Sequence, residues 1–156
     1  MNNYVLYGYG ESVASNVVRL ALAEKNISYD YKLLYLESRG DHLKDDYKKL
    51  NPKTLLPTLT VNEKPISESI DIMRFIDNEH TDQGSTLFPK NQDEEFDKLL
   101  DYLFLDDTKE LGETFGTTGG GISVPVLGKL LCKRSFFSVL WDYLKNHGVS
   151  KRKPIF

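Results

Sequence analysis

The sequence has few of the residues that build disulfide frameworks and metal sites. Its 156 residues contain one cysteine, Cys132, and three histidines. One cysteine cannot form an internal disulfide or a Cys-x-x-Cys site, and it suits a reducing compartment. No zinc-type Cys/His spacing, His-Glu-x-x-His or Gly-x-Ser-x-Gly pattern occurs. Disulfide scaffolds, and enzymes that depend on those metal or serine motifs, are therefore excluded.

Long apolar runs and an excess of basic charge are also missing. No apolar run approaches the ~18 residues of a membrane-spanning helix. The start, Met1-Asn2-Asn3, has neither the basic region nor the apolar core of a secretory signal. A net charge of −3 argues against nucleic acid or an acidic membrane surface as a main partner. We therefore expect a soluble, cytoplasmic protein.

The sequence does contain enough apolar residues to form a packed core. Hydrophobic residues make up 40% of the chain, including nine tyrosines and eight phenylalanines. This composition is that of a folded protein and not of a disordered one. The length predicts one domain, or one domain and part of a second.

The first 35 residues read as strand, helix, strand. Residues 4–7 are a short apolar strand that stops at Gly8-Tyr9-Gly10, and residues 29–35 form a second strand. The helix between them places apolar residues on one face, namely Val13, Val17, Leu20 and Ala21. Such a unit requires a right-handed crossover and a parallel strand pair. A polar run over 37–41 ends the second strand, with Gly40 as the turn residue, and residues 43–50 form a short helix.

The stretch from Asn51 to Ile76 predicts a hairpin followed by a helix. Pro57 precedes the alternating strand 58–61, residues 62–64 turn, and residues 66–67 return. A helix then runs from Glu68 to Glu79, with Ile72, Met73 and Ile76 on one face. This order places two features next to each other. One is the strand edge beside Pro57, and the other is a helix N-terminus, whose free N–H groups attract anions.

Beyond residue 80 the pattern is helical only. Residues 81–91 are polar and read as a linker. We predict one helix from the spacing of Phe96, Leu99, Leu100 and Leu103. We predict a second helix from the apolar residues between Leu127 and Leu144. The glycine-rich segment 112–121 between them lacks the order and the lysine of a phosphate-binding loop, so we interpret it as a connection.

Four parts of this pattern resemble the glutathione transferase N-terminal domain, which shows N-P-x-x-x-[hydrophobic]-P, a hairpin, and then E-S-x-x-I. The matching residues are Asn51-Pro52, Leu56-Pro57, Glu68-Ser69 and Ile72. The resemblance implies an α/β thioredoxin-like domain over 1–80, a linker over 81–91, and a short all-α C-terminal domain over 92–156. The family's helical domain is longer, and this chain stops at Phe156, so we expect either a fragment or a natural short form.

The same resemblance implies that glutathione is the co-substrate and that a hydroxyl stabilises its thiolate. Ungapped counting from Arg19 places this catalytic hydroxyl on Ser12 at the helix start, where the helix dipole also acts. A different alignment of this sequence with the family places the catalytic hydroxyl on Ser15. Tyr7 and Tyr9 are weaker alternatives. No cysteine lies nearby, which disfavours a glutathione-dependent reductase.

The remaining glutathione contacts follow from the family motif. Glu68 is expected to bind the γ-glutamyl ammonium and Ser69 its carboxylate. The backbone of Leu56, next to a cis Pro57, would pair with the cysteinyl unit. His42 would bind the glycyl carboxylate.

The resemblance thus predicts a glutathione transferase active in detoxification, which joins the glutathione thiolate to a small, apolar electrophile. It also implies a homodimer, with no metal, nucleic-acid or membrane partner. The alternative function is a non-catalytic interaction module of the same fold. That alternative is favoured by the short helical domain and by Leu55, which stands where many members have a lysine or glutamine donor.

Overall fold

The computed structural model describes residues 2–89, 91, 94–104, 109–110, 112–118, 135, 137–138 and 141. The second predicted C-terminal helix and Cys132 lie outside the described residues, apart from isolated positions. Within the segment interpreted as a connection, residues 115–118 form a helical turn. The side chains of Thr114 and Thr117 each accept a hydrogen bond from the other's backbone N–H, which caps that turn.

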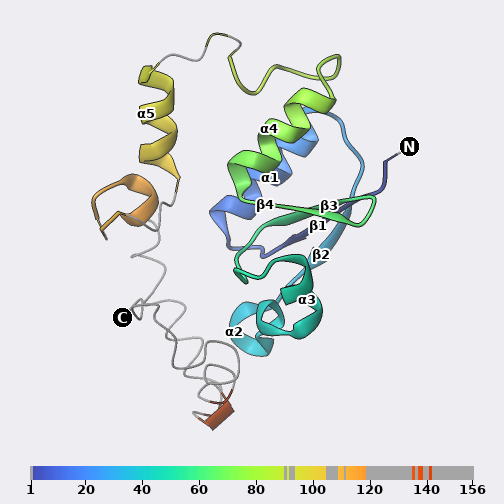
Figure 1. Cartoon of the computed structure of the whole chain (residues 1–156), viewed down its shortest axis with the longest axis vertical. Coiled ribbons are helices and arrows are strands. Elements are labelled where there is room, and N and C mark those ends of the chain that lie inside the picture. Colours follow the sequence, from blue (N-terminus) through green and yellow to red (C-terminus); the bar gives the residue numbers. More distant parts are fainter. Residues whose placement is uncertain are drawn as a thin grey trace.

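The first 80 residues are built on a four-stranded mixed sheet (Figure 1). Its strands are β1 (Tyr4–Gly8), β2 (Asp30–Leu33), β3 (Thr58–Val61) and β4 (Lys64–Ser67), in the order β2-β1-β3-β4. β1 and β2 are parallel, and the other neighbours are antiparallel. The predicted strand-helix-strand unit and hairpin are therefore confirmed, and the arrangement is thioredoxin-like.

Helices cover both faces of the sheet. Figure 1 shows α1 (Val13–Glu24) and α4 (Ser69–Glu79) on one face, and α2 (Leu36–Arg39) and α3 (Asp45–Leu50) on the other. A 3-10 turn, η1 (Asp41–Leu43), joins α2 to α3. The core lies between the sheet and the pair α1 and α4, where six side chains are fully buried: Leu6, Val18, Leu22, Leu59, Ile72 and Ile76. As predicted, Ile72, Met73 and Ile76 form the buried face of α4.

The predicted buried face of α1 is confirmed for Ala21, which is buried, and wrong for Val13 and Leu20. Val13 and Leu20 are 74% and 69% exposed, and the buried residues are Ser15, Val18, Ala21 and Leu22. The helix carries adjacent apolar residues at 17–18 and 20–22, so two overlapping faces fit a helical period equally well. Contact with the sheet selects the face that contains Ser15.

The segment after β2 also differs from expectation. The strand ends at Leu33, and α2 begins at Leu36 within the predicted strand-to-loop region. Gly40, at φ 59°, ends α2 as the predicted turn residue. The predicted helix 43–50 is divided, because Lys44 is extended between η1 and α3.

The polar segment after α4 is held against the N-terminal fold. Asp77 in α4 accepts hydrogen bonds from the backbone N–H groups of Leu87, at 3.1 Å, and Phe88, at 3.0 Å. It also pairs with the ammonium of Lys25 at the end of α1, at 2.7 Å. The ring of Phe88 contacts Phe96 in α5 (Glu94–Leu103), with 6.3 Å between centroids. Among the described residues, no helix is long and apolar enough to cross a membrane.

Candidate functional site

The strand register brings the predicted glutathione residues to one end of the sheet. Thr58, the first residue of β3, pairs with Tyr7 near the end of β1 and with Ser67 at the end of β4. α1 starts shortly after β1, and α4 starts directly after β4. Pro57 and the N-termini of α1 and α4 therefore lie at the same end of the sheet, as expected from the order of the elements.

Ser12 is the N-cap of α1, and its hydroxyl is partly exposed. Its Oγ accepts a hydrogen bond from the backbone N–H of Ser15, at 3.2 Å. A hydroxyl can accept this bond and still donate its own proton. Ser12 can therefore cap the helix and donate a hydrogen bond to a ligand at the same time.

Ser15, the alternative hydroxyl, is packed inside the fold. Its side chain is fully buried, and its Oγ accepts from the backbone N–H of Tyr9, at 3.3 Å. The hydroxyl of Tyr9 donates to a carboxylate oxygen of Glu11, at 2.9 Å. Of the two serines, Ser12 is the one that a ligand can reach without rearrangement of the core.

The N-terminus of α4 differs from that of α1 because no side chain caps it. Its N-cap residue is Glu68, which makes no side-chain capping bond. Within the described residues, the N–H groups of Ser69, Ile70 and Asp71 and the hydroxyl of Ser69 have no hydrogen-bond partner. An uncapped helix start of this kind presents N–H donors and the positive end of the helix dipole to an anion.

Glu68 has an unusual backbone conformation at φ 68°, ψ 125°. A residue with a side chain held at positive φ costs roughly 1–3 kcal/mol, and such residues cluster at ligand sites. Glycine would adopt this conformation more easily. The presence of a glutamate here therefore points to a use for its carboxylate, which is about half exposed.

Lys53 belongs to this candidate site, although the sequence did not predict it. Its ammonium lies 3.0 Å from Oε1 of Glu68. Leu55, which stands where many members of the family have a donor, is a 46% exposed apolar side chain. Thr54 has φ 58°, a turn that no apolar periodicity would reveal, so the sequence carried no clear signal for this pair.

The peptide bond between Leu56 and Pro57 is cis, as the family motif implied. Pro57 is buried, and within the described part of the chain the backbone N–H and C=O of Leu56 have no hydrogen-bond partner. These two groups have the pattern of a free strand edge, which can pair with an extended peptide.

Asn51 and Tyr47 hold the segment before Pro57 in place. Asn51 is 2% exposed, and its amide donates to the carbonyl of Leu55, at 2.9 Å, and to Oγ1 of Thr58, at 3.1 Å. The hydroxyl of Tyr47 bonds the same two atoms, at 2.6 and 2.8 Å. Burial raises the pKa of Tyr47 to about 12, so its hydroxyl stays protonated. In the sequence Asn51 is only one residue of the family motif; in the structure its amide holds this segment in place.

His42 lies in η1, between α2 and α3. Its neighbour Asp41 is buried and accepts hydrogen bonds from Lys44 and from the backbone N–H of Tyr35, the latter at 3.0 Å. Burial alone would raise the pKa of Asp41, but these bonds outweigh it and hold the pKa below its ordinary value. The assignment of His42 to the glycyl carboxylate stays a prediction. In the described part of the chain, no three His, Cys, Asp or Glu side chains are grouped to hold a metal.

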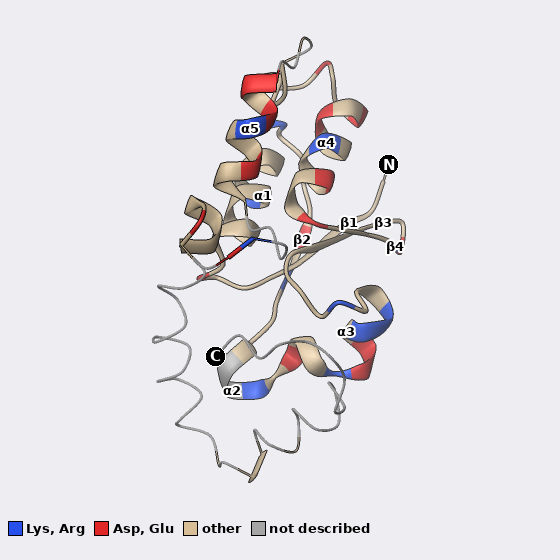
Figure 2. Ribbon diagram, turned by 60° about the vertical axis from the view of Figure 1, so that its left-hand side comes forward, with Lys and Arg blue, Asp and Glu red and all other residues tan. Residues whose placement is uncertain are grey.

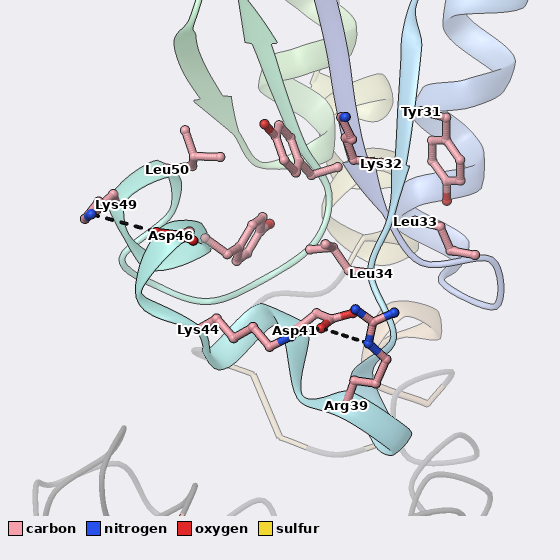
Figure 3. A pocket seen from close by; sticks show the side chains of 12 residues that line it. Tyr31, Lys32, Leu33, Leu34, Arg39, Asp41, Lys44, Asp46, Lys49 and Leu50 are labelled. Carbon is pink, nitrogen blue, oxygen red and sulfur yellow. Dashed lines mark hydrogen bonds and ion pairs between the residues drawn. The ribbon is translucent and has the colours of Figure 1, made fainter.

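A cavity of about 570 Å³ lies elsewhere, between the sheet and the segment α2-η1-α3 (Figure 3). Its lining includes Tyr7, Lys32, Tyr47 and Leu50. None of the six residues predicted to bind or activate glutathione lines it. It adjoins that site through Tyr47, whose hydroxyl bonds the carbonyl of Leu55.

Comparison with known proteins finds similar sequences over the part of the chain that contains this site. Residues 12–79 match the family model described as "Glutathione S-transferase, N-terminal domain". A maleylacetoacetate isomerase of Dictyostelium discoideum is 40% identical over 90 residues, which are 57% of this chain and 40% of that protein. Glutathione S-transferase Z1 of Arabidopsis thaliana is 35% identical over 75 residues, 48% of this chain and 34% of that protein.

A solved structure also matches part of the chain. It is a maleylacetoacetate isomerase from Methylobacterium extorquens AM1 with bound malonate and glutathione, 31% identical with a TM-score of 0.52. The alignment covers 56% of this chain and 40% of that one. The chain thus spans well under half the length of each of these relatives. The matched segment, the thioredoxin-like fold and these relatives together show that residues 12–79 form a glutathione S-transferase N-terminal domain.

Proposed function

We propose that this chain binds glutathione and presents its thiolate to a small electrophile. The observation that carries the proposal is the meeting of four features at one end of the sheet. They are the Ser12 hydroxyl, the unpaired backbone of Leu56, the carboxylate of Glu68 and the uncapped start of α4. The structure of a relative with bound glutathione supports the same ligand here.

Each charged group of glutathione has a suitable partner in this arrangement. The γ-glutamyl carboxylate would accept from the N–H groups at the start of α4 and from the Ser69 hydroxyl. The γ-glutamyl ammonium would pair with Glu68, which now holds Lys53 at 3.0 Å. The cysteinyl backbone would pair with Leu56 as a short strand. We assign the glycyl carboxylate to His42.

Ser12 would donate a hydrogen bond to the glutathione sulfur and favour its ionised form. A free thiol with a pKa near 8.5 is only about 3% ionised at pH 7, and a pKa lower by about two units would raise that fraction to roughly three-quarters. The lower basicity also reduces sulfur reactivity by about tenfold, if the Brønsted slope of ~0.4–0.5 from thiol–disulfide exchange applies. The net gain is a few-fold, so most of the acceleration would come from holding the two reactants together.

The thiolate could serve two reactions with the same first step. In transfer, it forms a bond to an electrophilic carbon of an apolar substrate. Either a leaving group departs with its bonding electrons, or a double bond is broken and the resulting anion takes up a proton from water. In isomerisation, it adds to a conjugated double bond and its electrons move to the carbonyl oxygen. The resulting single bond rotates, and loss of the thiolate restores the double bond, so glutathione is regenerated. The names of the Dictyostelium and Methylobacterium relatives favour the second reaction as a candidate.

Two measurements test the proposal in sequence. Calorimetry with glutathione should show binding to the parent chain and weaker binding to a Glu68→Gln variant. Activity is then measured with a generic aryl halide and with maleylpyruvate, whose isomerisation is named for another relative. Binding without turnover of either substrate would favour the non-catalytic interaction module, and absence of binding would overturn the proposal.

The assembly and location of the protein are part of the same proposal. We assign a homodimer, because several apolar side chains are exposed, among them Leu99, Tyr102 and Leu103 of α5. We assign the cytoplasm, because glutathione is abundant in its reduced form in a reducing compartment. Sedimentation at several protein concentrations would test the dimer.

A further inference from the structure

Asn16, near the start of α1, ties this helix to the loop that precedes Ser12. Its side-chain amide donates a hydrogen bond to the carbonyl of Gly10, at 2.9 Å. Its backbone N–H donates to the carbonyl of Ser12, at 3.0 Å. One residue therefore holds the chain on both sides of Glu11.

The position of the Ser12 hydroxyl depends on this loop. The backbone N–H of Ser12 donates to the carbonyl of Tyr9, at 3.1 Å, and its carbonyl accepts from Asn16. Its Oγ accepts from the backbone N–H of Ser15, at 3.2 Å. The surrounding backbone thus sets the place of the oxygen, and the hydroxyl proton remains available to a ligand.

Gly10 is the residue of this loop with the most backbone freedom. A glycine loses more conformational freedom on folding than any other residue. Gly10 has no positive φ, and a Cβ built on it would meet nothing within 4 Å, so neither backbone conformation nor lack of space requires a glycine here. Within the described residues, the Asn16 amide is the one donor that reaches the Gly10 carbonyl. That bond therefore restrains the most flexible point before Ser12.

Arg19 fixes the orientation of the Asn16 amide. Its Nη1 donates to Oδ1 of Asn16, at 3.0 Å. Only one orientation of the amide satisfies both bonds, with the nitrogen toward Gly10 and the oxygen toward Arg19. Figure 2 shows α1 and α4 side by side on one face of the sheet, and the guanidinium of Arg19 lies 5.1 Å from the centre of the Tyr31 ring in β2. This cation–π contact connects the amide to the sheet.

We propose that Asn16 is a positioning residue, which holds Ser12 where its hydroxyl can donate to the glutathione sulfur. The inference rests on the proposed function and adds a residue to it. Asn16 acts through the segment from Gly10 to Ser12 and has no need to touch the ligand. Without the amide bond, this segment samples other conformations and the hydroxyl spends less time at the sulfur. The pKa of the bound thiol then rises toward that of free glutathione.

The pKa of the bound thiol, measured from the ultraviolet absorption of the thiolate as a function of pH, tests the proposal. Loss of one neutral hydrogen bond in Asn16→Ala should raise this pKa by roughly 0.4–1 unit, and by no more than Ser12→Ala does. Glutathione affinity, measured by calorimetry, should change by no more than about twofold. The matched control is Asn78→Ala, the same replacement at an exposed position of α4, which should leave the pKa of the thiol unchanged.

A double-mutant cycle with Ser12→Ala separates positioning from a general effect on the fold. If Asn16 acts through Ser12, Asn16→Ala adds no further shift in the Ser12→Ala background. The same cycle is measured with Asn16→Asp, which keeps the size of the side chain and the acceptor for Arg19 but loses the donor to Gly10. The direct effect of its added charge on the thiol persists in the Ser12→Ala background. Only the part of the shift that disappears there therefore counts as positioning.

Several results would overturn the inference alone. They are an equal thiol pKa in the parent and both Asn16 variants, or shifts of equal size in both backgrounds. Loss of glutathione binding in both Asn16 variants, whatever its cause, would show that Asn16 maintains the whole site and also overturn it.

Failure of the proposed function gives different results. A parent chain that does not bind glutathione would overturn that function together with this inference. A parent that binds glutathione, but whose thiol pKa is the same in Ser12→Ala, would overturn the role of Ser12 and of Asn16 and leave glutathione binding in place.

Discussion

Replacing Asp77 with alanine would leave the ammonium of Lys25 buried without a counter-ion. The Lys25 side chain is 1% exposed and that of Asp77 11%, and the two groups lie 2.7 Å apart. After the substitution the ammonium keeps one acceptor, the backbone carbonyl of His80 at 3.2 Å. The N–H groups of Leu87 and Phe88 lose their acceptor as well. Removing one partner of a buried pair costs roughly 3–5 kcal/mol, a large share of the ~5–15 kcal/mol that stabilises a typical domain.

Urea unfolding followed by far-UV circular dichroism measures this cost. With a slope of ~1–3 kcal/mol per molar urea, the midpoint of Asp77→Ala should fall by at least about 1 M. The matched control is Glu79→Ala, which removes the same charge from an exposed position of α4 and should stay within ~0.5 kcal/mol of the parent. A loss below about 1 kcal/mol in Asp77→Ala would refute the claim that this pair anchors the linker.

The pH dependence of stability provides a second check on the same pair. Burial would raise the pKa of Asp77, but the bonds from Lys25 and from the two backbone N–H groups outweigh it and lower the pKa. A carboxyl whose pKa is lower in the folded state stabilises the fold above its ordinary pKa, near 3.9. That stabilisation is lost as the pH falls through the folded value. The stability gap between the parent and Asp77→Asn should therefore be constant from pH 7 to about 5 and narrow below about pH 4. A gap that stays constant down to pH 2 would contradict this account.

Three further predictions concern the site and the linker. Ser69→Ala should weaken glutathione binding by about 10- to 150-fold in calorimetry, the cost of a hydrogen bond to a charged group; equal affinity would remove Ser69 from the site. Ser12→Ala should keep glutathione binding but move the ionisation in kcat/KM upward by about one unit or more; a profile that moves only in Ser15→Ala would favour the other serine. Gly84→Ala should lower the urea midpoint, since a Cβ there would lie 2.0 Å from the carbonyl oxygen of Glu24 at a φ of +61°. In Gly10→Ala, where nothing lies within 4 Å of the added atom, the urea midpoint should be unchanged.

The sequence predicted the elements of the N-terminal fold because their signals are local. Alternation at 58–61, Pro57 before it and the apolar spacing of α4 each depend on a few neighbouring residues. The rotation of α1 about its axis could not be predicted in the same way. Val17 and Val18 are both apolar, and only contact with β1 and β3 decides which of them is buried, namely Val18.

In the candidate glutathione site, the sequence identified the residues that a motif names and not the one that tertiary contact brings there. Glu68, Ser69 and Pro57 belong to a recognisable sequence pattern, and the cis bond before Pro57 agrees with it. Lys53 reaches Glu68 across 15 residues through a turn with left-handed backbone at Thr54. A charged pair at that separation has no periodic signature, so only the folded chain reveals it.

The two candidate serines illustrate why the burial of a side chain cannot be predicted from its spacing along the sequence. Ser12 and Ser15 are three residues apart, a separation that places both on the same side of a helix. Ser12, however, is the cap and has extended backbone at ψ 117°, so its hydroxyl stays outside the helical packing. Ser15 lies one turn further in, against the end of β1, where a Cβ at Gly8 would come within 3.2 Å of it. A glycine at position 8 thus lets Ser15 pack against the strand, and that packing leaves Ser12 as the accessible hydroxyl at the helix start.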